Sequence, residues 1–342
     1  MRLGQYLMRR IAFSILVLVG LSIVIFIIAR VVPGDPTRMA LGARAPQWAV
    51  DKLKAEMNLD KPLQVQYVYW LKGALRGDFG TSLVTRRPVV EDVKEFLPAT
   101  VELVIFAGLI QSLFGILLGI LAAMYSNTWV DGLIRLLAYL GVVTPAFVFA
   151  VLFLLLFGYS WQVLPTAGRL SNGIAAPPLI TGMVTVDSLI TGHLTAFWDS
   201  LKHLLLPGLA LAMGGLSQEA RITRSAMSDN LNKDYIALET SQGIPRRVII
   251  SKYLLKPSLI PTVSIMGLDF ASLFGNAFLV ELIFNWPGFS RYGITTMLRK
   301  DLNAISAVIL VLGLVFIVVN MATDIIVSYL DPRIRLGAGK DA

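Results

Sequence analysis

The stretch "SQGIPRRVIISKYLLKPSLIP", from Ser241 to Pro261, interrupts a strongly apolar chain with one glycine, three prolines and four cations. Gly243 suits the position just after a helix C-terminus, and Pro245 suits the first turn of a following helix. The pattern therefore predicts two short helices that meet at a bend and carry both apolar and basic faces. From these residues alone, the segment is either an amphipathic connector lying in the lipid headgroup layer or a docking element for a partner protein.

The composition around this stretch is that of a membrane protein. Hydrophobic residues make up 56% of the 342 residues, charged residues make up 15%, and the mean hydropathy is +0.70. Soluble domains carry about 25% charged residues, and an uncharged apolar run of about 18 residues or more predicts a membrane-spanning helix. We therefore predict an all-α polytopic membrane protein with six transmembrane helices. The predicted spans are Ile11–Ala29, Leu103–Tyr125, Leu136–Tyr159, the shorter Leu204–Ser217, Leu259–Ile283 and Ala304–Leu330.

The arginines and lysines predict the orientation of these spans. They gather before the first span, between the fourth and fifth, and after the sixth, and basic residues stay on the cytoplasmic side. Both termini and the quoted stretch are therefore expected in the cytoplasm. A seventh span over Ile174–Leu194 would contain Pro177 and Pro178, which favour an interfacial or re-entrant loop instead. Between the first two spans, helices are expected after Pro46 and Pro62.

A longer segment around the quoted stretch, "DYIALETSQGIPRRVIISKYLLKPSLIP", resembles the cytoplasmic coupling loop of ABC importer permeases of the dipeptide, oligopeptide and nickel family. The chain is similar to that family over nearly its whole length, in "VVPGDP", "LDKPLQVQYVYWLKGALRGDFGTSL", "LPATVEL", "FNWPGFSRYG" and "LDPRIR". It departs from the family at Glu239, where a small residue is usual, and in "RKDLNAIS" after the fifth span. The positions that match the loop motif are Tyr235, Gly243, Arg246, Arg247, Val248 and Pro261.

This resemblance implies a type I ABC importer permease fold with an extracytoplasmic insertion between helices 1 and 2. The implied division is residues 1–32 for the cytoplasmic N-terminus and first helix, 33–98 for the extracytoplasmic subdomain, 99–330 for the permease core with its coupling loop at 229–256, and 331–342 for a cytoplasmic tail. The implied function is half of an ATP-driven import pathway for peptides, most commonly dipeptides or oligopeptides. The same architecture in the family also imports nickel, glutathione or oligosaccharides.

The resemblance also implies the partners: a second, usually different, homologous permease, two ATPase subunits or domains, an extracytoplasmic substrate-binding protein and membrane lipid, but no nucleic acid. The implied location is a bacterial or archaeal cell membrane. This chain lacks a GxxxxGK[ST] phosphate loop, so we expect no enzyme activity and no cofactor of its own, with ATP and magnesium held by the ATPase partners. The residues expected to couple to the ATPase are Tyr235, Ala237, Leu238, Glu239, Gly243, Ile244, Arg246 and Arg247.

Polar residues inside the spans are the candidates for a substrate pathway, because burying them in lipid is costly. Asp269 and Asn276 are seven residues apart and share one helix face, and Glu281 follows near the end of the same span. Each has an alternative role in an interhelical hydrogen bond or at a span end. The two histidines are isolated and there is no cysteine, so we expect neither a metal site nor a disulfide.

Two further points stay open at the level of sequence. Pro145 and Pro207 interrupt backbone hydrogen bonding in the third and fourth spans, where they serve either as hinges or as packing kinks. An ion-coupled secondary transporter is the main rival function, although Asp269 alone offers it little support. An intramembrane hydrolase is a weaker rival, since none of its usual motifs occurs in the sequence.

Overall fold

The computed structural model describes residues 3–31, 36–42, 44–56 and 58–330, and the regular elements in these ranges are all helices. This confirms the all-α class; the predicted tail at 331–342 lies outside the described residues. The elements are α1 (Leu3–Val31), α2 (Pro36–Leu41), α3 (Gln47–Glu56), α4 (Leu63–Leu75), α5 (Val89–Met124), α6 (Trp129–Val143), α7 (Ala146–Phe153), the π-helix η1 (Leu154–Ser160), α8 (Val184–Ile190), α9 (Leu194–Leu231), α10 (Asp234–Ser241), α11 (Arg246–Val248), the π-helix η2 (Ile249–Leu254), α12 (Leu255–Ile283), α13 (Phe289–Leu298) and α14 (Leu302–Leu330).

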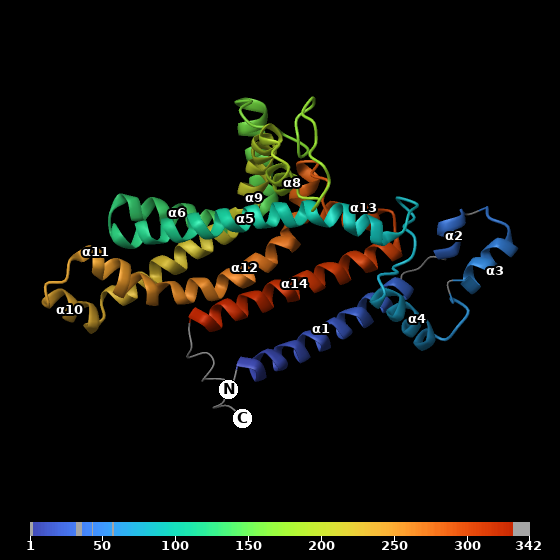
Figure 1. Ribbon diagram of the computed structural model, residues 1–342, viewed down its shortest axis with the longest axis horizontal. Coiled ribbons are helices and arrows are strands. Elements are labelled where there is room, and N and C mark those ends of the chain that lie inside the picture. The colour runs from blue at the N-terminus through green and yellow to red at the C-terminus, as the bar shows by residue number, and fades with distance from the viewer. Residues whose placement is uncertain (1–2, 32–35, 43, 57, 331–342) are drawn as a thin grey trace.

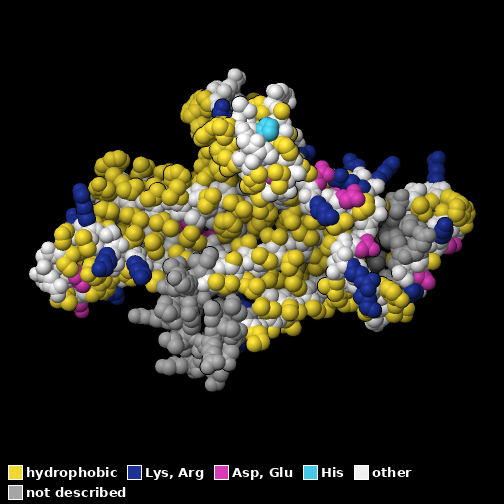
Figure 2. All heavy atoms as spheres, in the orientation of Figure 1, with side chains coloured by type: hydrophobic (Ala, Val, Ile, Leu, Met, Phe, Trp, Pro, Cys, Tyr) yellow, Lys and Arg dark blue, Asp and Glu magenta, His cyan; other side chains and the backbone are white. Residues whose placement is uncertain are grey.

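The long helices α1, α5, α12 and α14 run along the longest axis of the molecule (Figure 1). One end of this bundle carries α10 and α11, and we call it the elbow end; the opposite end carries α2, α3 and α4 and is called the far end. Hydrophobic side chains cover the middle of the visible surface, whereas arginines and lysines gather toward the two ends (Figure 2). This distribution is that of a bundle whose middle faces lipid.

Four stretches of the described residues are long and apolar enough to cross a membrane, and a bent pair makes a fifth if it is one span. The four lie in α1, α5, α12 with the two short helices before it, and α14; the bent pair is α6 with α7–η1. The structure therefore supports four to five apolar spans rather than the predicted six. The long helix α9 is not among these apolar stretches.

The third predicted span, Leu136–Tyr159, is not a single straight helix. The chain bends by 110° between α6 and α7, at Thr144 and Pro145. Proline has no backbone N–H and forces the preceding residue out of the helical region, and Thr144 accordingly has ψ 122°. By contrast, α9 continues without interruption through Pro207.

The central helix of the packing is α9, which is 38 residues long and contacts α5, α12, α6 and α7. Its seam with α5 depends on glycine: a Cβ added at Gly115 would lie 2.8 Å from the Glu219 Cβ, and one at Gly119 would lie 2.5 Å from the Thr223 Cβ. Glycine at these points lets the two helices approach closely, as small residues do between membrane helices. Leu204, Leu206 and other buried residues of α9 complete an apolar core with α5, α7 and α12.

Buried carboxylates fasten the far end of the bundle. Asp92 accepts hydrogen bonds from Thr85 Oγ1 and the Tyr292 hydroxyl, both at 2.7 Å, and Asp301 accepts one from Ser82 Oγ at 2.6 Å. Burial, together with the hydrogen bond to Asp92, raises the pKa of Tyr292. These bonds tie the start of α5 to α13, and the segment before α5 to the residue that precedes α14, although the bonded residues lie about two hundred positions apart in sequence.

A buried carboxylate also holds the connection between η1 and α9. Asp187 accepts hydrogen bonds from Thr181 Oγ1 at 2.7 Å and from the backbone N–H groups of Thr181 and Gly182. Burial raises the pKa of Asp187, but these hydrogen bonds outweigh it and the pKa is lower than usual. The described residues form a loop followed by the short helix α8 here, so the structure gives no spanning helix over Ile174–Leu194.

Candidate functional site

We call residues Asp234–Leu254, which comprise α10, the turn at Gly243, α11 and η2, the elbow. Helix α10 ends in a Schellman motif: the Ile244 N–H donates to the Glu239 carbonyl at 3.3 Å, and the Gly243 N–H donates to the Thr240 carbonyl at 3.1 Å. Gly243 has φ +74°, which side chains with a Cβ adopt only at a cost. Pro245 then precedes α11, so the predicted pair of helices meeting at a glycine bend is confirmed.

An apolar cluster attaches the elbow to the bundle. Ile236 of α10 and Ile249 and Leu254 of η2 are buried together with Ala123 of α5 and Met227 of α9. The part of the elbow on each side of Gly243 therefore contacts long helices directly. Because η2 continues into α12 without a break, a displacement of the elbow is transmitted to α5, α9 and α12.

The opposite side of the elbow faces outward. Leu238 is 56% exposed and Val248 is 40% exposed, so the elbow presents apolar side chains on its outer side. Arg246 and Arg247 are exposed beside them, at the start of α11. Of the other residues predicted to couple to an ATPase, Tyr235, Ala237 and Gly243 are exposed, and Glu239 and Ile244 are half-buried.

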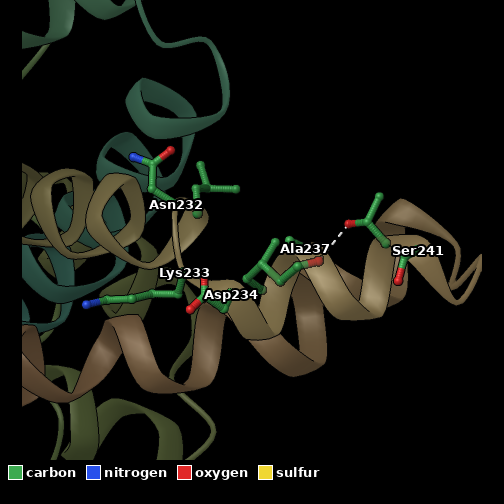
Figure 3. A pocket seen from close by; sticks show the side chains of 8 residues that line it. Asn232, Lys233, Asp234, Ala237 and Ser241 are labelled. Atoms are coloured by element: carbon green, nitrogen blue, oxygen red, sulfur yellow. Dashed lines mark hydrogen bonds between the residues drawn. The ribbon is translucent and has the colours of Figure 1, made fainter.

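A pocket of about 510 Å³ opens between the end of α9 and α10 (Figure 3). The side chains of Asn232, Lys233 and Asp234 line one part of it, and Ser241 lies at the other end of α10. Its complete lining is Leu231, Asn232, Lys233, Asp234, Ile236, Ala237, Thr240 and Ser241. The elbow thus offers a partner a concave surface with both charged and apolar groups.

Sequence reasoning missed the polar bridge that braces the root of the elbow. Asn230 near the end of α9 donates from Nδ2 to Ser258 Oγ of α12 at 3.0 Å, and its Oδ1 accepts from the Tyr235 hydroxyl at 3.1 Å. Partial burial raises the pKa of Tyr235, so this hydroxyl remains a donor at neutral pH. No local signal identifies the bridge, because Asn230 and Ser258 are 28 residues apart.

The pathway candidates occupy different environments along α12. Asn276 is exposed and belongs to one stripe of the helix that combines polar and apolar residues. The hydroxyls of Ser264 and Ser272 donate to backbone carbonyls of the same helix, but in lipid the Asn276 amide would lack hydrogen-bond partners. The stripe is therefore suited to water or to another protein. The exposed residues of the stripe are Ser264, Leu268, Ser272, Gly275, Asn276 and Leu279.

Asp269 lies beside this stripe but is half-buried and faces α9. It is close enough to Glu219 of α9 for the two carboxyl groups to interact. Among the described residues, both oxygens of Glu219, Oδ2 of Asp269 and both polar side-chain atoms of Gln111 are buried without a hydrogen-bond partner. Polar side chains buried in an apolar bundle without partners are candidates for a functional region. The sequence identified Asp269 as such a candidate but gave no signal that Glu219 lies beside it.

Glu281 is fully buried, away from the exposed stripe. Its carboxylate accepts hydrogen bonds from Thr100 Oγ1 at 2.5 Å and from the Arg291 backbone N–H at 2.7 Å, at the start of α13. A Cβ at Gly288 would lie 2.3 Å from this carboxyl group, so the chain needs glycine there. The geometry indicates that Glu281 caps α13 and joins it to α5.

The described residues thus form an apolar helical bundle with an exposed elbow that packs against three of its long helices. The family of the "Binding-protein-dependent transport system inner membrane component" matches residues 115–336, and the N-terminal family of the same transport systems matches residues 3–104. The chain belongs to this family, the permeases of ABC importers.

Similar proteins cover the chain almost completely. It is 38% identical over 326 residues to the probable D,D-dipeptide transport system permease protein of Escherichia coli (strain K12), covering 95% of this chain and 96% of that protein. It is also 38% identical to the dipeptide transport system permease protein of Alkalihalophilus pseudofirmus, over 96% of this chain and 99% of that one. Identity to the glutathione transport system permease protein of Salmonella typhimurium is 33%, over 97% of this chain and 99% of that protein.

Proposed function

We propose that this chain forms half of the transmembrane pathway of an ATP-driven importer of dipeptides. Two similar permeases at 38% identity carry dipeptides in their names, and both align over nearly their whole length. The observation that carries the proposal is the elbow, which is exposed on one side and packed against α5, α9 and α12 on the other. A force applied to that exposed side would move three long helices together.

The proposed topology has six spans. It adds α9, the fourth span in chain order, to the four apolar helices and the bent pair. The low hydropathy of α9 is expected of a helix whose neighbours are protein, because contacts with α5, α6, α7 and α12 replace contacts with lipid. The elbow end is assigned to the cytoplasm, since the basic residues of the elbow and of the start of α1 favour that side. Helices α2, α3 and α4 then belong to an extracytoplasmic insertion at 33–98.

The partners follow from the class of transporter. Two cytoplasmic ATPase subunits would each receive one elbow, this one through the exposed side chains of Tyr235, Leu238, Arg246 and Arg247 and the adjoining pocket. ATP and magnesium are bound by those subunits, because this chain has no phosphate loop. A second permease would supply the other half of the pathway, and a binding protein would deliver the substrate from outside.

The substrate would pass along the exposed stripe of α12. A second permease facing this stripe would enclose its polar groups in a water-filled passage, which removes the cost of exposing the Asn276 amide to lipid. Asp269, half-buried beside the stripe, would add a polar carboxyl group at the edge of this passage, with Glu219 buried behind it. Glu281 belongs to the support of α13 in this proposal and would not touch substrate.

Uptake into vesicles tests the function directly. The complete transporter, purified with its ATPase and second permease and supplied with its binding protein, is reconstituted with ATP beside the elbow end and with ion gradients collapsed by ionophores. We expect uptake of a labelled dipeptide that requires ATP and is competed by unlabelled dipeptide but not by glutathione. Uptake that stops when the ion gradients collapse would indicate a secondary transporter, and competition by glutathione alone would assign the substrate of the third relative.

A further inference from the structure

A second, smaller cavity lies between α6 and α9, away from the elbow and from the α12 stripe. It has a volume of about 180 Å³, and four residues from each helix line it. Three of these eight side chains are arginines, which is a high density of charge for a groove beside an apolar bundle. The lining is Ile134, Arg135, Ala138, Tyr139, Ala220, Arg221, Arg224 and Ser225.

The arginines are only partly neutralised by protein. Arg224 binds the buried Asp131 through two hydrogen bonds, Nε to Oδ1 at 2.5 Å and Nη2 to Oδ2 at 2.8 Å. Arg135 lies 3.5 Å from the same carboxylate and its side chain is 47% exposed, while Arg221 is exposed and makes no ion pair with any residue that the structure describes. Two guanidinium groups thus share one carboxylate and the third has none among the described residues, which leaves the groove positively charged.

The surroundings of the groove are apolar and aromatic. Leu133, Leu136, Leu137 and Leu140 of α6 are each between 47% and 56% exposed, and they share the face of α6 that is turned away from the groove. That face is suited to contact with lipid. Trp129 at the start of α6 is 78% exposed. Exposed tryptophan is typical of the boundary between lipid tails and headgroups.

The position of the groove along α9 agrees with the boundary between lipid tails and headgroups. Arg224 precedes the last residue of α9, Leu231, by seven positions, which corresponds to about 10 Å along the helix axis. In the proposed topology, which this inference requires, the end of α9 lies in the cytoplasm. The groove then lies about 10 Å from the cytoplasmic end of α9, a distance comparable with the thickness of the headgroup layer, about 5–8 Å.

We propose that the groove between α6 and α9 binds the phosphate of an anionic phospholipid. Arg135 and Arg221 are the phosphate ligands, because their guanidinium groups are accessible and match a phosphate in shape and charge. Arg224 remains bound to Asp131 and shapes the groove. The bound lipid bridges α6 to α9 next to the 110° bend, where the mutual repulsion of the arginines would otherwise separate the two helices.

The test uses the complete purified transporter in phosphatidylcholine nanodiscs that contain a trace of photoactivatable phosphatidylglycerol, followed by mapping of the labelled peptides. We expect labelling of the α6 and α9 segments, and a decrease of about fivefold for each arginine removed in Arg135→Gln and Arg221→Gln. The double variant Arg135→Lys/Arg221→Lys keeps the charge and should retain most of the labelling. Inorganic phosphate should not displace the lipid.

The matched control is Arg9→Gln/Arg10→Gln, which removes the same charge from the first turns of α1 but no groove residue. It should leave labelling of α6 and α9 unchanged. Equal loss in this control would show that surface charge alone attracts the lipid and would overturn the proposal. Unchanged labelling in Arg135→Gln/Arg221→Gln, or displacement of the lipid by inorganic phosphate, would overturn it as well. Dipeptide uptake is measured separately, so failure here does not depend on the substrate.

Discussion

Gly243 fixes the direction in which α11 leaves α10, and its role is conformational rather than steric. Its φ is +74°, but a Cβ added there would meet no atom within 4 Å. A β-branched residue would fit in space and still be strained by about 1–2 kcal/mol, whereas asparagine tolerates this conformation better. The turn is therefore a place where backbone geometry can be changed with little effect on packing.

We predict that Gly243→Val uncouples ATP hydrolysis from transport. The ATPase subunits should still hydrolyse ATP, but dipeptide uptake should fall severalfold because the elbow no longer holds its angle. Gly243→Asn is the matched control and should retain most of the uptake. Equal uptake by the valine variant and the wild type, measured per ATP hydrolysed, would contradict this role.

Asp269 and Glu281 are predicted to respond in opposite ways to loss of charge. Glu281→Gln replaces a carboxylate that accepts two hydrogen bonds, so it should cost about 1–3 kcal/mol of stability and lower the Tm of the complex. Asp269→Asn should leave the Tm unchanged or higher, because Oδ2 has no partner to lose, but should change the uptake rate. Lower uptake by Glu281→Gln at an unchanged Tm would place Glu281 in the pathway instead.

Gly243 and Glu281 differ in how far the sequence could predict their environments. Gly243 was predictable because the signal is local: a helical pattern before it and a proline two residues after it. The environment of Glu281 was not predictable, because its partner Thr100 is 181 residues away and only the folded chain brings them together. The same holds for Asp131 and Arg224, which are 93 residues apart.

At the level of elements, the sequence predicted best the helices that face outward. The apolar runs in α1, α12 and α14 were recognised because these helices expose their leucines, valines and isoleucines. Helix α9 was recognised only over Leu204–Ser217, since its neighbours in the bundle allow polar residues such as Glu219. The bend at Pro145 was predicted as an interruption of hydrogen bonding, but its size depends on the packing of α7 against α9.

The elbow acts as one element in this account, so its surface charge matters as much as its shape. We predict that Arg246→Glu/Arg247→Glu lowers dipeptide-stimulated ATPase activity at least as strongly as uptake, because it weakens contact with the ATPase. Both side chains are exposed, and exposed substitutions change stability by only about 0.5 kcal/mol. The Tm should therefore stay close to that of the wild type.

A charge reversal of the same size at the far end separates this effect from net charge. Arg44 and Lys52 are exposed there, and Arg44→Glu/Lys52→Glu should leave ATPase activity and uptake unchanged. If both double variants lose activity equally, the elbow has no special part in coupling. If neither does, contact with the ATPase does not depend on the two arginines.

The whole molecule is organised along its long axis. Carboxylate networks fix the far end, the glycine seam between α5 and α9 holds the middle, and the elbow projects from the other end. Three long helices connect the middle to the elbow, and the stripe on α12 leaves one side of the bundle incomplete. This is the expected form of half a passage, moved from one end and closed by a second subunit.

The most direct measurement is a crosslink from the elbow in the assembled transporter. The chain has no cysteine, so Leu238→Cys introduces a single thiol on the outward face of α10, and Leu75→Cys does the same at the far end. We predict that a short bifunctional reagent joins the thiol at position 238 to an ATPase subunit and that ATP changes the yield. The thiol at 75 should give no such product. An elbow thiol that reacts only with lipid or water-soluble reagents, with and without ATP, would contradict the account.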